Sequence, residues 1–517
     1  MTETSTPPPN EPAVYTGDRA RPIAEVKERA ARIATGLSEL GLGQNDRYCI
    51  VMRNEVGFVE ATLAGGVIGA VPVPVNWHWT GDDLGHLLQD SEAKVAIVHT
   101  DLLPAVEQHK PEAMQIVEAQ VAPELVTAYS LGDVPLTGRY PTLDELAQRP
   151  PVTEPNTVPP SSVIYTSGTT GLAKGIVREP MTPDRVPAVA EAVMDLLMFR
   201  PGEPTLVPAP MYHTSPNVHF IWATMLGVQT HIMPRFIPTE FLRMVEKYRI
   251  VSVQMVPVMF RRLLDVPEEE RAKYDLSSLK YVVHAAAPCP ADLKEAMIDW
   301  LGPIVYEYYG GSEGGAWTRV NSEEALAHPG TVGRQWRDNQ IAIVGPDDQE
   351  VPAGETGMVY GRSGGFWPEF TYLHNDQKRR DISRGDFFTL GDIGHVDEEG
   401  YLYLSDRAND MVISGGVNIY PAEIEASLHN LDGVRDVAVF GIPDEQMGEA
   451  LAAHLELEEG AELTEDDVRT FVRENLAAYK VPKVVVFEER LPREDTGKLF
   501  KRRIKEKYWQ GKQRISG

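Results

Sequence analysis

The chain has 517 residues, of which 42% are hydrophobic and 24% are charged, and its formal net charge is −27. This length exceeds what one hydrophobic core supports, so it predicts two or more domains. A strongly acidic surface repels phosphate backbones and anionic lipids, which argues against nucleic acid or a membrane as the main partner. No apolar run is long enough for a membrane span.

The N-terminus carries neither a basic start nor an apolar run, so it is not a signal peptide. Its composition, M-T-E-T-S-T-P-P-P-N-E-P, predicts a disordered tail over residues 1–17. The two cysteines, Cys49 and Cys289, argue against a disulfide framework or a metal–cysteine site. This usage suits a reducing compartment, and we expect a cytoplasmic protein.

Helical and strand patterns alternate through the first two thirds of the chain. Apolar residues recur at helical spacing over 58–67, and V-P-V-P-V then reads as an extended piece. The predicted strands cover 94–99, 250–256, 279–284 and 303–309, and the predicted helices cover 239–248 and 291–301. Such alternation predicts α/β layers with sheets covered by helices.

The pattern of residue types changes after residue 345. Short β-rich pieces with glycine and aspartate, over 345–405, predict hairpins or a small β-barrel-like subdomain. After Arg407 the alternation resumes, with a helix over 421–431 that has proline at its start, a strand over 434–440 and a helix over 464–476. The last helix opens with T-E-D-D, a candidate N-cap followed by acids. This tail predicts a small α+β domain.

One loop is unusually rich in glycine and hydroxyl residues. The string Y-T-S-G-T-T-G-L-A-K-G provides backbone N–H groups, hydroxyls and one lysine, which together suit a polyphosphate. The candidate clamp consists of Thr166, Ser167, Gly168, Thr169, Thr170, Gly171 and Lys174. A Walker-type spacing is absent, and the β-branched residues that follow predict a loop between two strands. By composition alone, a flexible surface turn is the favoured alternative.

The complete string resembles the signature of the adenylate-forming superfamily, which includes acyl-CoA synthetases, peptide-synthetase adenylation domains and beetle luciferases. The proline usual before the lysine is Ala173 here. The resemblance extends from about Asp18 to Lys507, with the family's other motifs in order. It implies an adenylation domain over residues 18–408 and a mobile C-terminal domain over 409–517 that carries the catalytic lysine.

Further motifs carry this resemblance through the large domain. Met211-Tyr212-His213-Thr214 resembles the motif whose histidine borders the acyl pocket, and His284-Ala285-Ala286-Ala287-Pro288 resembles the segment that flanks adenine. Tyr309-Gly310-Gly311-Ser312-Glu313 is similar to the family's Y-G-x-T-E. A tyrosine ring can stack on adenine, a hydroxyl can bind phosphate and a carboxylate can hold Mg²⁺.

The resemblance also implies the residues that bind the ribose. The Asp392 carboxylate, in Gly391-Asp392, offers two acceptor oxygens for the two ribose hydroxyls, and Arg407 is expected beside it. The threonine usual before this glycine is Leu390, with Thr389 one place earlier. The implied ATP-binding set is Thr166, Ser167, Gly168, Thr169, Thr170, Gly171, Lys174, Ala286, Ala287, Pro288, Tyr309, Gly310, Ser312, Asp392, Arg407 and Lys498.

In the C-terminal part, Asn409 falls at the family's interdomain hinge. Ser414, Gly415 and Gly416 resemble the loop that approaches the pantetheine tunnel, and paired glycines suit a close backbone approach. Lys498, in L-P-R-E-D-T-G-K, resembles the catalytic lysine, whereas Lys501 and Lys505 are expected to be solvated surface charges.

The resemblance implies two half-reactions with ATP, Mg²⁺ and coenzyme A. The predicted catalytic residues are Lys498, His213 and Glu313, and the predicted metal-binding residues are Glu313 and Thr169. The predicted acyl pocket is formed by His213, Phe220, Trp222, Gly311 and Gly314. Core packing at helical spacing is an open alternative for Phe220 and Trp222.

The tail stretch F-G-I-P-D-E-Q-M-G-E-A-L-A-A-H resembles acyl-CoA synthetases more than peptide-synthetase domains. No acid follows the histidine motif where amino-acid-activating relatives place one, so we expect a carboxylic acid without an α-amino group. The prediction is therefore an AMP-forming acid–CoA ligase. The alternatives are an enzyme that loads an acyl carrier protein, a catalytically silent nucleotide-binding protein and a luciferase-like oxygenase.

Overall fold

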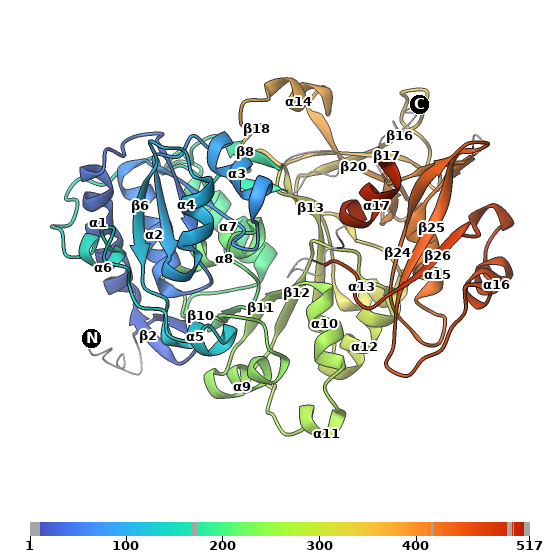
Figure 1. The fold of residues 1–517 in the computed structure, drawn as a ribbon, viewed down its shortest axis with the longest axis horizontal. Coiled ribbons are helices and arrows are strands. Elements are labelled where there is room, and N and C mark those ends of the chain that lie inside the picture. Colours follow the sequence, from blue (N-terminus) through green and yellow to red (C-terminus); the bar gives the residue numbers. More distant parts are fainter. Residues whose placement is uncertain are drawn as a thin grey trace.

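The computed structural model describes residues 11–166, 173–408, 410–414, 417–493, 499 and 501–510. The chain forms a large N-terminal domain and a smaller C-terminal domain at one end of the molecule (Figure 1). Within the described residues, no helix is both long enough and apolar enough to cross a membrane.

The largest sheet has nine strands, and most neighbouring pairs in its middle are parallel. In spatial order they are β15 (Arg334–Gln335), β14 (Gly315–Val320), β13 (Val305–Gly311), β12 (Tyr281–His284), β11 (Ser252–Met255), β9 (Thr205–Val207), β10 (Thr230–Ile232), β1 (Ala13–Thr16) and β2 (Arg19–Pro22). A second, parallel sheet contains β4 (Val71–Pro74), β3 (Arg47–Val51), β5 (Val95–His99) and β6 (Gln115–Ala119). The prolines of β4 lie on an edge strand, where a missing N–H costs least.

The first strand corrects the predicted tail. Ala13 and Val14 are fully buried, and β1 pairs with both β10 and β2. The expected disordered segment of residues 1–17 is therefore wrong from Ala13 onward, because A-V-Y-T places apolar side chains in the core. Residues 1–10 lie outside the described part of the chain.

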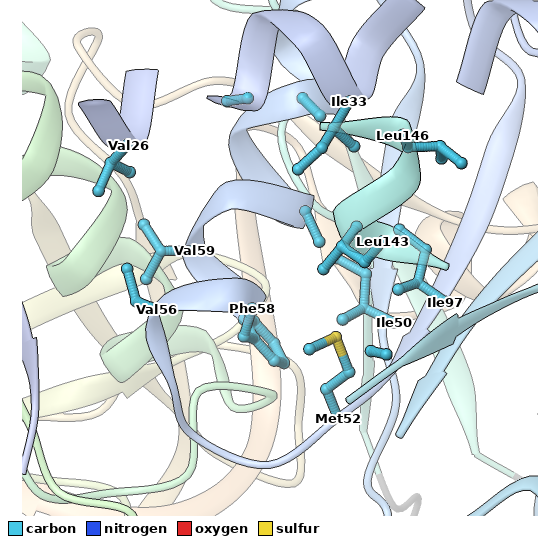
Figure 2. Packing of buried hydrophobic residues seen from close by; sticks show 14 of the residues in the cluster. Val26, Ile33, Ile50, Met52, Val56, Phe58, Val59, Ile97, Leu143 and Leu146 are labelled. Carbon is cyan, nitrogen blue, oxygen red and sulfur yellow. The ribbon is translucent and has the colours of Figure 1, made fainter. Parts of the chain in front are cut away.

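Three layers of helices alternate with the two sheets. The middle layer is α1 (Ile23–Glu39), α2 (Val56–Ile68), α6 (Leu143–Leu146) and α8 (Thr214–Met225), and its core contains buried residues from both sheets. Figure 2 shows this core, where Val26 of α1 lies near Val59 of α2, and Ile33 of α1 lies toward Leu143 and Leu146 of α6. The outer layers are α3 (Gly81–Asp90) with α4 (Leu103–His109), and α9 (Pro238–Tyr248) with α10 (Pro257–Leu264) and α12 (Ala291–Leu301). The predicted α/β layers are confirmed.

Two smaller sheets lie between these layers and the C-terminal domain. One contains β7 (Ile164–Thr166), β8 (Lys174–Arg178) and β18 (Phe370–Tyr372). The other is antiparallel and contains β16 (Gln340–Val344), β17 (Gly357–Arg362), β19 (Ser383–Arg384), β20 (Phe387–Val396) and β21 (Leu402–Arg407). It confirms the predicted hairpins. The remaining elements of this domain are α5 (Pro123–Tyr129), α7 (Val186–Leu197), α11 (Glu268–Arg271), α13 (Ser322–Ala327), α14 (Asp376–Asp381) and the 3₁₀ turn η1 (Thr100–Leu102).

The C-terminal domain has its own core and its own five-stranded sheet. Its strands are β22 (Val412–Ser414), β23 (Val417–Ile419), β24 (Val434–Asp444), β25 (Gly448–Leu457) and β26 (Val484–Glu488). Its helices are α15 (Pro421–Leu428), α16 (Glu465–Asn475), α17 (Lys501–Trp509) and the 3₁₀ turn η2 (Ala478–Lys480). As predicted, proline begins α15 and Thr464 caps α16, where Thr464 and Asp467 form a capping box.

Candidate active site

The glycine- and threonine-rich loop connects two antiparallel strands. Thr166 at the end of β7 pairs with Lys174 at the start of β8, so the prediction of a strand–loop–strand unit is confirmed. Both ends of the loop are tied to α3: the Tyr165 hydroxyl donates to Asp90 at 2.7 Å, and His86 Nε2 contacts the Ala173 carbonyl oxygen at 2.9 Å. The loop residues Ser167, Gly168, Thr169, Thr170 and Gly171 lie outside the described residues.

A carboxylate from the β13–β14 hairpin lies near Lys174, at the described end of this loop. Glu313 lies in the turn between β13 and β14, and its Oε1 accepts a hydrogen bond of 3.0 Å from the Tyr372 hydroxyl of β18. The Lys174 ammonium lies 6.0 Å from the centre of the Tyr372 ring. Burial lowers the pKa of Lys174, and the positive charge of Lys378 lowers it further. The negative charge of Glu313 raises it in part. One carboxylate and one ammonium therefore lie near the same tyrosine, on the strand next to β8.

Three predicted ribose- and adenine-binding side chains form a connected cluster. Asp392 of β20 accepts from the Tyr309 hydroxyl at 2.6 Å and from Arg407 Nε at 3.2 Å. Asp392 and Arg407 are direct partners in the β20–β21 pairing, and Asp392 is only 7% exposed. Burial and the Asp392 charge raise the pKa of Tyr309 well above its ordinary value, so this hydroxyl stays a donor.

The predicted adenine segment leaves the end of β12 in a strained turn. Ala286 has a φ of 76°, which side chains other than glycine rarely adopt. Ala286 and Pro288 are exposed and Ala287 is half-buried, whereas Ala285 is buried. Small exposed side chains on a strained backbone leave room for a flat ring.

Two hydroxyl contacts join the start of α8 to β13 and the turn after it. The hydroxyls of Thr214 and Ser312 hydrogen-bond to each other, and the Tyr308 hydroxyl donates to Ser215 Oγ at 2.7 Å. His213 is the N-cap residue of α8. His213 therefore directly precedes Thr214, and Thr214 contacts Ser312, the predicted phosphate-binding serine.

Close packing requires glycine at position 310 of this hairpin and leaves little room at position 311. A Cβ on Gly310 would lie 1.8 Å from the Gly315 carbonyl oxygen, and one on Gly311 would lie 2.9 Å from Leu390. Leu390, which replaces the family's threonine, therefore packs against Gly311. Thr389 Oγ1 accepts from the Gly391 N–H at 2.9 Å, so a local hydroxyl contact is still made.

The predicted acyl-pocket residues do not all lie together. Phe220 is fully buried in the middle layer, with its ring 5.8 Å from that of Phe58. Trp222 lies with Tyr308 at a separate cluster around α7. The structure thus brings Trp222, but not Phe220, to the side of α8 that faces β13. Gly314 borders an apolar cavity of about 10 Å³, about the room of one water.

A wider polar hollow of about 850 Å³ opens beside Glu313. Its lining includes Arg337, Arg362, Trp367, Arg379 and Phe388. A hollow of this size is within the range of small-molecule sites. Among the described residues, no group of three or more histidine, cysteine or acidic side chains is arranged to hold a metal ion.

Comparison with known proteins assigns this constellation to a family. The family described as "AMP-binding enzyme" matches residues 2–367, and the one described as "AMP-binding enzyme C-terminal domain" matches residues 423–498. The chain belongs to the AMP-binding enzyme family. This confirms the resemblance to the adenylate-forming superfamily.

Individual relatives cover almost the whole chain. The long-chain-fatty-acid–CoA ligase FadD13 of Mycobacterium tuberculosis is 32% identical and covers 94% of this chain and 92% of its own. Feruloyl-CoA synthase of Amycolatopsis sp. is 33% identical and covers 97% of this chain and 96% of its own. The ATP-bound crystal structure of MatB from Rhodopseudomonas palustris has a TM-score of 0.80 at 26% identity, covering 97% of each chain. The predicted enzyme class, an AMP-forming acid–CoA ligase, is confirmed.

Several predicted residues of this AMP-binding enzyme remain without a described position. Lys498, Asn409, Gly415 and Gly416 lie outside the described residues. Ser414 ends β22, where it pairs with Val417 of β23 and Gly448 of β25. The division at residue 408/409 stays a prediction; it falls between β21, which ends at Arg407, and β22, which begins at Val412.

Sequence reasoning missed two asparagines that hold the histidine segment. Asn54 donates to the carbonyl oxygens of Ala209 at 2.8 Å and Met233 at 3.2 Å, and it accepts from the Met211 N–H at 2.8 Å. Asn217 donates to the Met211 carbonyl oxygen at 3.1 Å. The peptide groups on both sides of Met211 are therefore fixed by buried amides, two residues before His213. No sequence signal distinguished Asn54, because its partners lie more than 150 residues away.

Sequence reasoning also misjudged Lys501. The expected solvated surface charge is wrong: its side chain is 17% exposed and its ammonium contacts Glu425 at 2.8 Å. The physical reason is that α17 packs against the C-terminal sheet instead of facing water on all sides.

Proposed function

We propose that this chain activates a carboxylic acid with ATP to an acyl-adenylate, releasing pyrophosphate. It then transfers the acyl group to the thiol of coenzyme A and releases AMP. The observation that carries this proposal is the Asp392 cluster with Tyr309 and Arg407, next to the Ser312–Glu313 turn. The names of the two sequence relatives, both acid–CoA ligases or synthases, support the same reaction.

In the first half-reaction the acid carboxylate attacks the α-phosphorus of ATP, and pyrophosphate leaves. Negative charge spreads over the phosphoryl oxygens, so positioning and electrostatics supply most of the catalysis. We assign the ribose to Asp392 and Arg407, the adenine to Tyr309 and the 286–288 segment, and the phosphates to Lys174, Ser312 and the loop 166–171. Lys498 bridges the acid carboxylate and the leaving oxygens.

The residues present fit a magnesium ion held mainly by the nucleotide. Mg²⁺ keeps several waters and binds nucleotide sites through one or two carboxylates together with phosphate oxygens. Glu313 Oε1 already accepts from Tyr372, which orients the carboxylate and leaves Oε2 for a cation. Glu313 and Thr169 would hold the ion, which would neutralise charge on the departing pyrophosphate.

In the second half-reaction the C-terminal domain rotates about Asn409. Lys498 then leaves the site, and Gly415 and Gly416, which follow β22 in the sequence, line the approach of the pantetheine thiol. One site can serve two reactions by such a rearrangement. His213, at the start of α8, borders the acyl group in both steps.

The acid is one without an α-amino group. The helix after the histidine motif, α8, is Thr214–Met225, and it contains no aspartate or glutamate that could pair with an ammonium. Its side toward β13 presents Ser215 and Trp222, a hydroxyl and an aromatic ring. Such a wall favours an apolar acyl group.

The reaction is tested with a panel of acids in ATP–pyrophosphate exchange, followed by AMP release with coenzyme A or a pantetheinylated carrier protein. We expect exchange with at least one acid and faster AMP release with coenzyme A. A faster reaction with the carrier would favour the carrier-loading alternative. Nucleotide binding without exchange for any acid would favour the silent binding protein.

The two-step mechanism is tested by Lys498→Ala. We expect loss of adenylation by at least a hundredfold, with thioester formation from a supplied acyl-adenylate within about fivefold of the parent enzyme, because transition-state charge stabilisation of this kind contributes a few kcal/mol. Lys507→Ala, an exposed lysine of α17, serves as the control. Equal loss in both steps would contradict the assignment of Lys498.

A further inference from the structure

One buried lysine lies three positions after Lys498, at the first residue of α17. The Lys501 ammonium contacts Glu425 Oε1 of α15 at 2.8 Å, and the two side chains are 17% and 18% exposed. The Glu425 oxygen also accepts from the Val439 N–H of β24 at 2.6 Å. Lys501 therefore joins α17 to α15 and, through Glu425, to the C-terminal sheet.

A carboxylate from the large domain lies in the same cluster. Asp406, in β21, accepts from the Ala422 N–H in the first turn of α15 at 2.9 Å. Its other oxygen accepts from the Arg407 N–H at 2.7 Å. Asp406 precedes residue 409 in the chain and Ala422 follows it, so this bond crosses the predicted domain boundary.

The charges of the cluster depend on Lys501. Burial would lower the pKa of Lys501, but Glu425, Asp410 and Asp406 together raise it. Burial raises the pKa of Asp406 to about 6, and Lys501 is the largest opposing charge. Three carboxylates thus interact with the Lys501 ammonium. The other ionisable groups beside them are Arg407 near Asp410, Tyr420 near Asp406, and His429 and Arg493 near Glu425. Removing the ammonium would leave like charges together in a poorly solvated place.

The same strand reaches the nucleotide-binding cluster. Arg407, the residue after Asp406, pairs with Asp392 at 3.2 Å. Because successive side chains of a strand point to opposite faces, β21 directs Arg407 toward Asp392 and Asp406 toward α15. A continuous set of contacts therefore runs from Asp392 to α17.

We propose that Lys501 is a positioning residue for the adenylation half-reaction. Through Glu425 it fixes α17 to α15, which is bonded to Asp406 of β21, and so it places the segment that carries Lys498 beside the nucleotide. This inference rests on the proposed function and on the role assigned to Lys498. Rotation about residue 409 separates Asp406 from Ala422 and from Lys501, while the Lys501–Glu425 pair moves with the C-terminal domain.

The test compares the two half-reactions in full-length variants. Lys501→Met removes the charge, Lys501→Gln keeps a hydrogen-bond donor, and Lys501→Arg is the conservative rescue. Lys507→Met, on the exposed side of the same helix, is the matched control. The readouts are ATP–pyrophosphate exchange with an acid that the parent enzyme uses, and thioester formation from the corresponding acyl-adenylate.

We expect Lys501→Met to slow exchange at least tenfold while thioester formation changes less than threefold, Lys501→Gln to be intermediate, and Lys501→Arg and Lys507→Met to stay within threefold. Retained thioester formation shows that the variant is folded. Equal loss of both steps in the Met and Gln variants, or no loss of exchange, would overturn the inference. Absence of exchange in the parent enzyme with every acid would instead reject the proposed function.

Discussion

At the scale of single residues, the site depends on side chains that are fixed before any ligand arrives. Asp392 is held by two donors from different strands, and Glu313 by the hydroxyl of a third. Each contact fixes the orientation of a carboxylate. Such pre-organisation lowers the cost of binding, because the side chains are already ordered.

Asp392→Asn tests this at the ribose site. The amide has one acceptor oxygen, so either Tyr309 or Arg407 loses its acceptor, and the charge partner of Arg407 disappears. Hydrogen bonds to charged groups contribute about 1.5–3 kcal/mol, so we expect the KM for ATP to rise roughly ten- to a hundredfold. The KM for the acid serves as the internal control, and an unchanged KM for ATP would contradict the ribose assignment.

At the scale of elements, the position of His213 is set by backbone contacts made far away in the sequence. Asn54 lies between β3 and α2 and holds the loop between β9 and α8. Three hydrogen bonds to main-chain groups make it a support for the start of α8. The same loop lies next to the Thr214–Ser312 contact, so a shift there would reach the phosphate side of the site.

Asn54→Ala leaves one buried N–H and two buried carbonyl groups without these partners. We expect a loss of about 1–3 kcal/mol in the free energy of unfolding and a rise in the KM for the acid of at least fivefold, with a smaller change for ATP. Asn321→Ala is the control, because Asn321 caps α13 away from the site and costs about 1 kcal/mol. Equal KM values in both variants would assign Asn54 a purely structural role. Thermal unfolding and steady-state kinetics provide the measurements.

The sequence predicted correctly those elements that are determined by residues next to one another in the chain. Pro421 at the start of α15, the Thr464 capping box and the strands on either side of the glycine-rich loop all follow from neighbouring residues. The side of α8 that faces the site was not predictable, because the apolar residues of α8 are not confined to one face: Phe220, Ile221 and Trp222 follow one another directly. Phe220 therefore looked like a pocket residue although it packs on Phe58. The burial of Lys501 depends on Asp406 and Glu425, which no local pattern relates to it.

At the scale of the whole molecule, the contact between the two domains depends on ionised groups. Asp406 has a pKa raised to about 6 by burial, above the value of an unfolded chain. The native protein then binds this proton more tightly than the unfolded chain, so the contribution of Asp406 to stability falls as pH rises from about 4 to about 6. This direction is opposite to that of a salt-bridged carboxylate with a lowered pKa.

Asp406→Asn isolates this contribution. We expect the free energy of unfolding of the parent, relative to the Asn variant, to decrease between pH 4.5 and pH 7 and to be constant above pH 7. Denaturant unfolding at several pH values, followed by a signal from the C-terminal domain, measures it. A parent-minus-variant difference that is flat across this range, or that rises with pH, would contradict a raised pKa for Asp406.

The alternation of side chains in β21 also limits how this enzyme can tolerate insertions. Asp406 and Arg407 serve different domains only because they are neighbours on opposite sides of one strand. The pairing with β20 shifts register between Leu404 and Asp406, but Asp406 and Arg407 themselves pair regularly with Ile393 and Asp392. Inserting one residue between Asp406 and Arg407 would place both side chains on one face and turn a positive group toward α15. Length changes in the turn before β21 leave this register intact, so we expect library selections for activity to accept indels at 397–400 and reject them inside the strand.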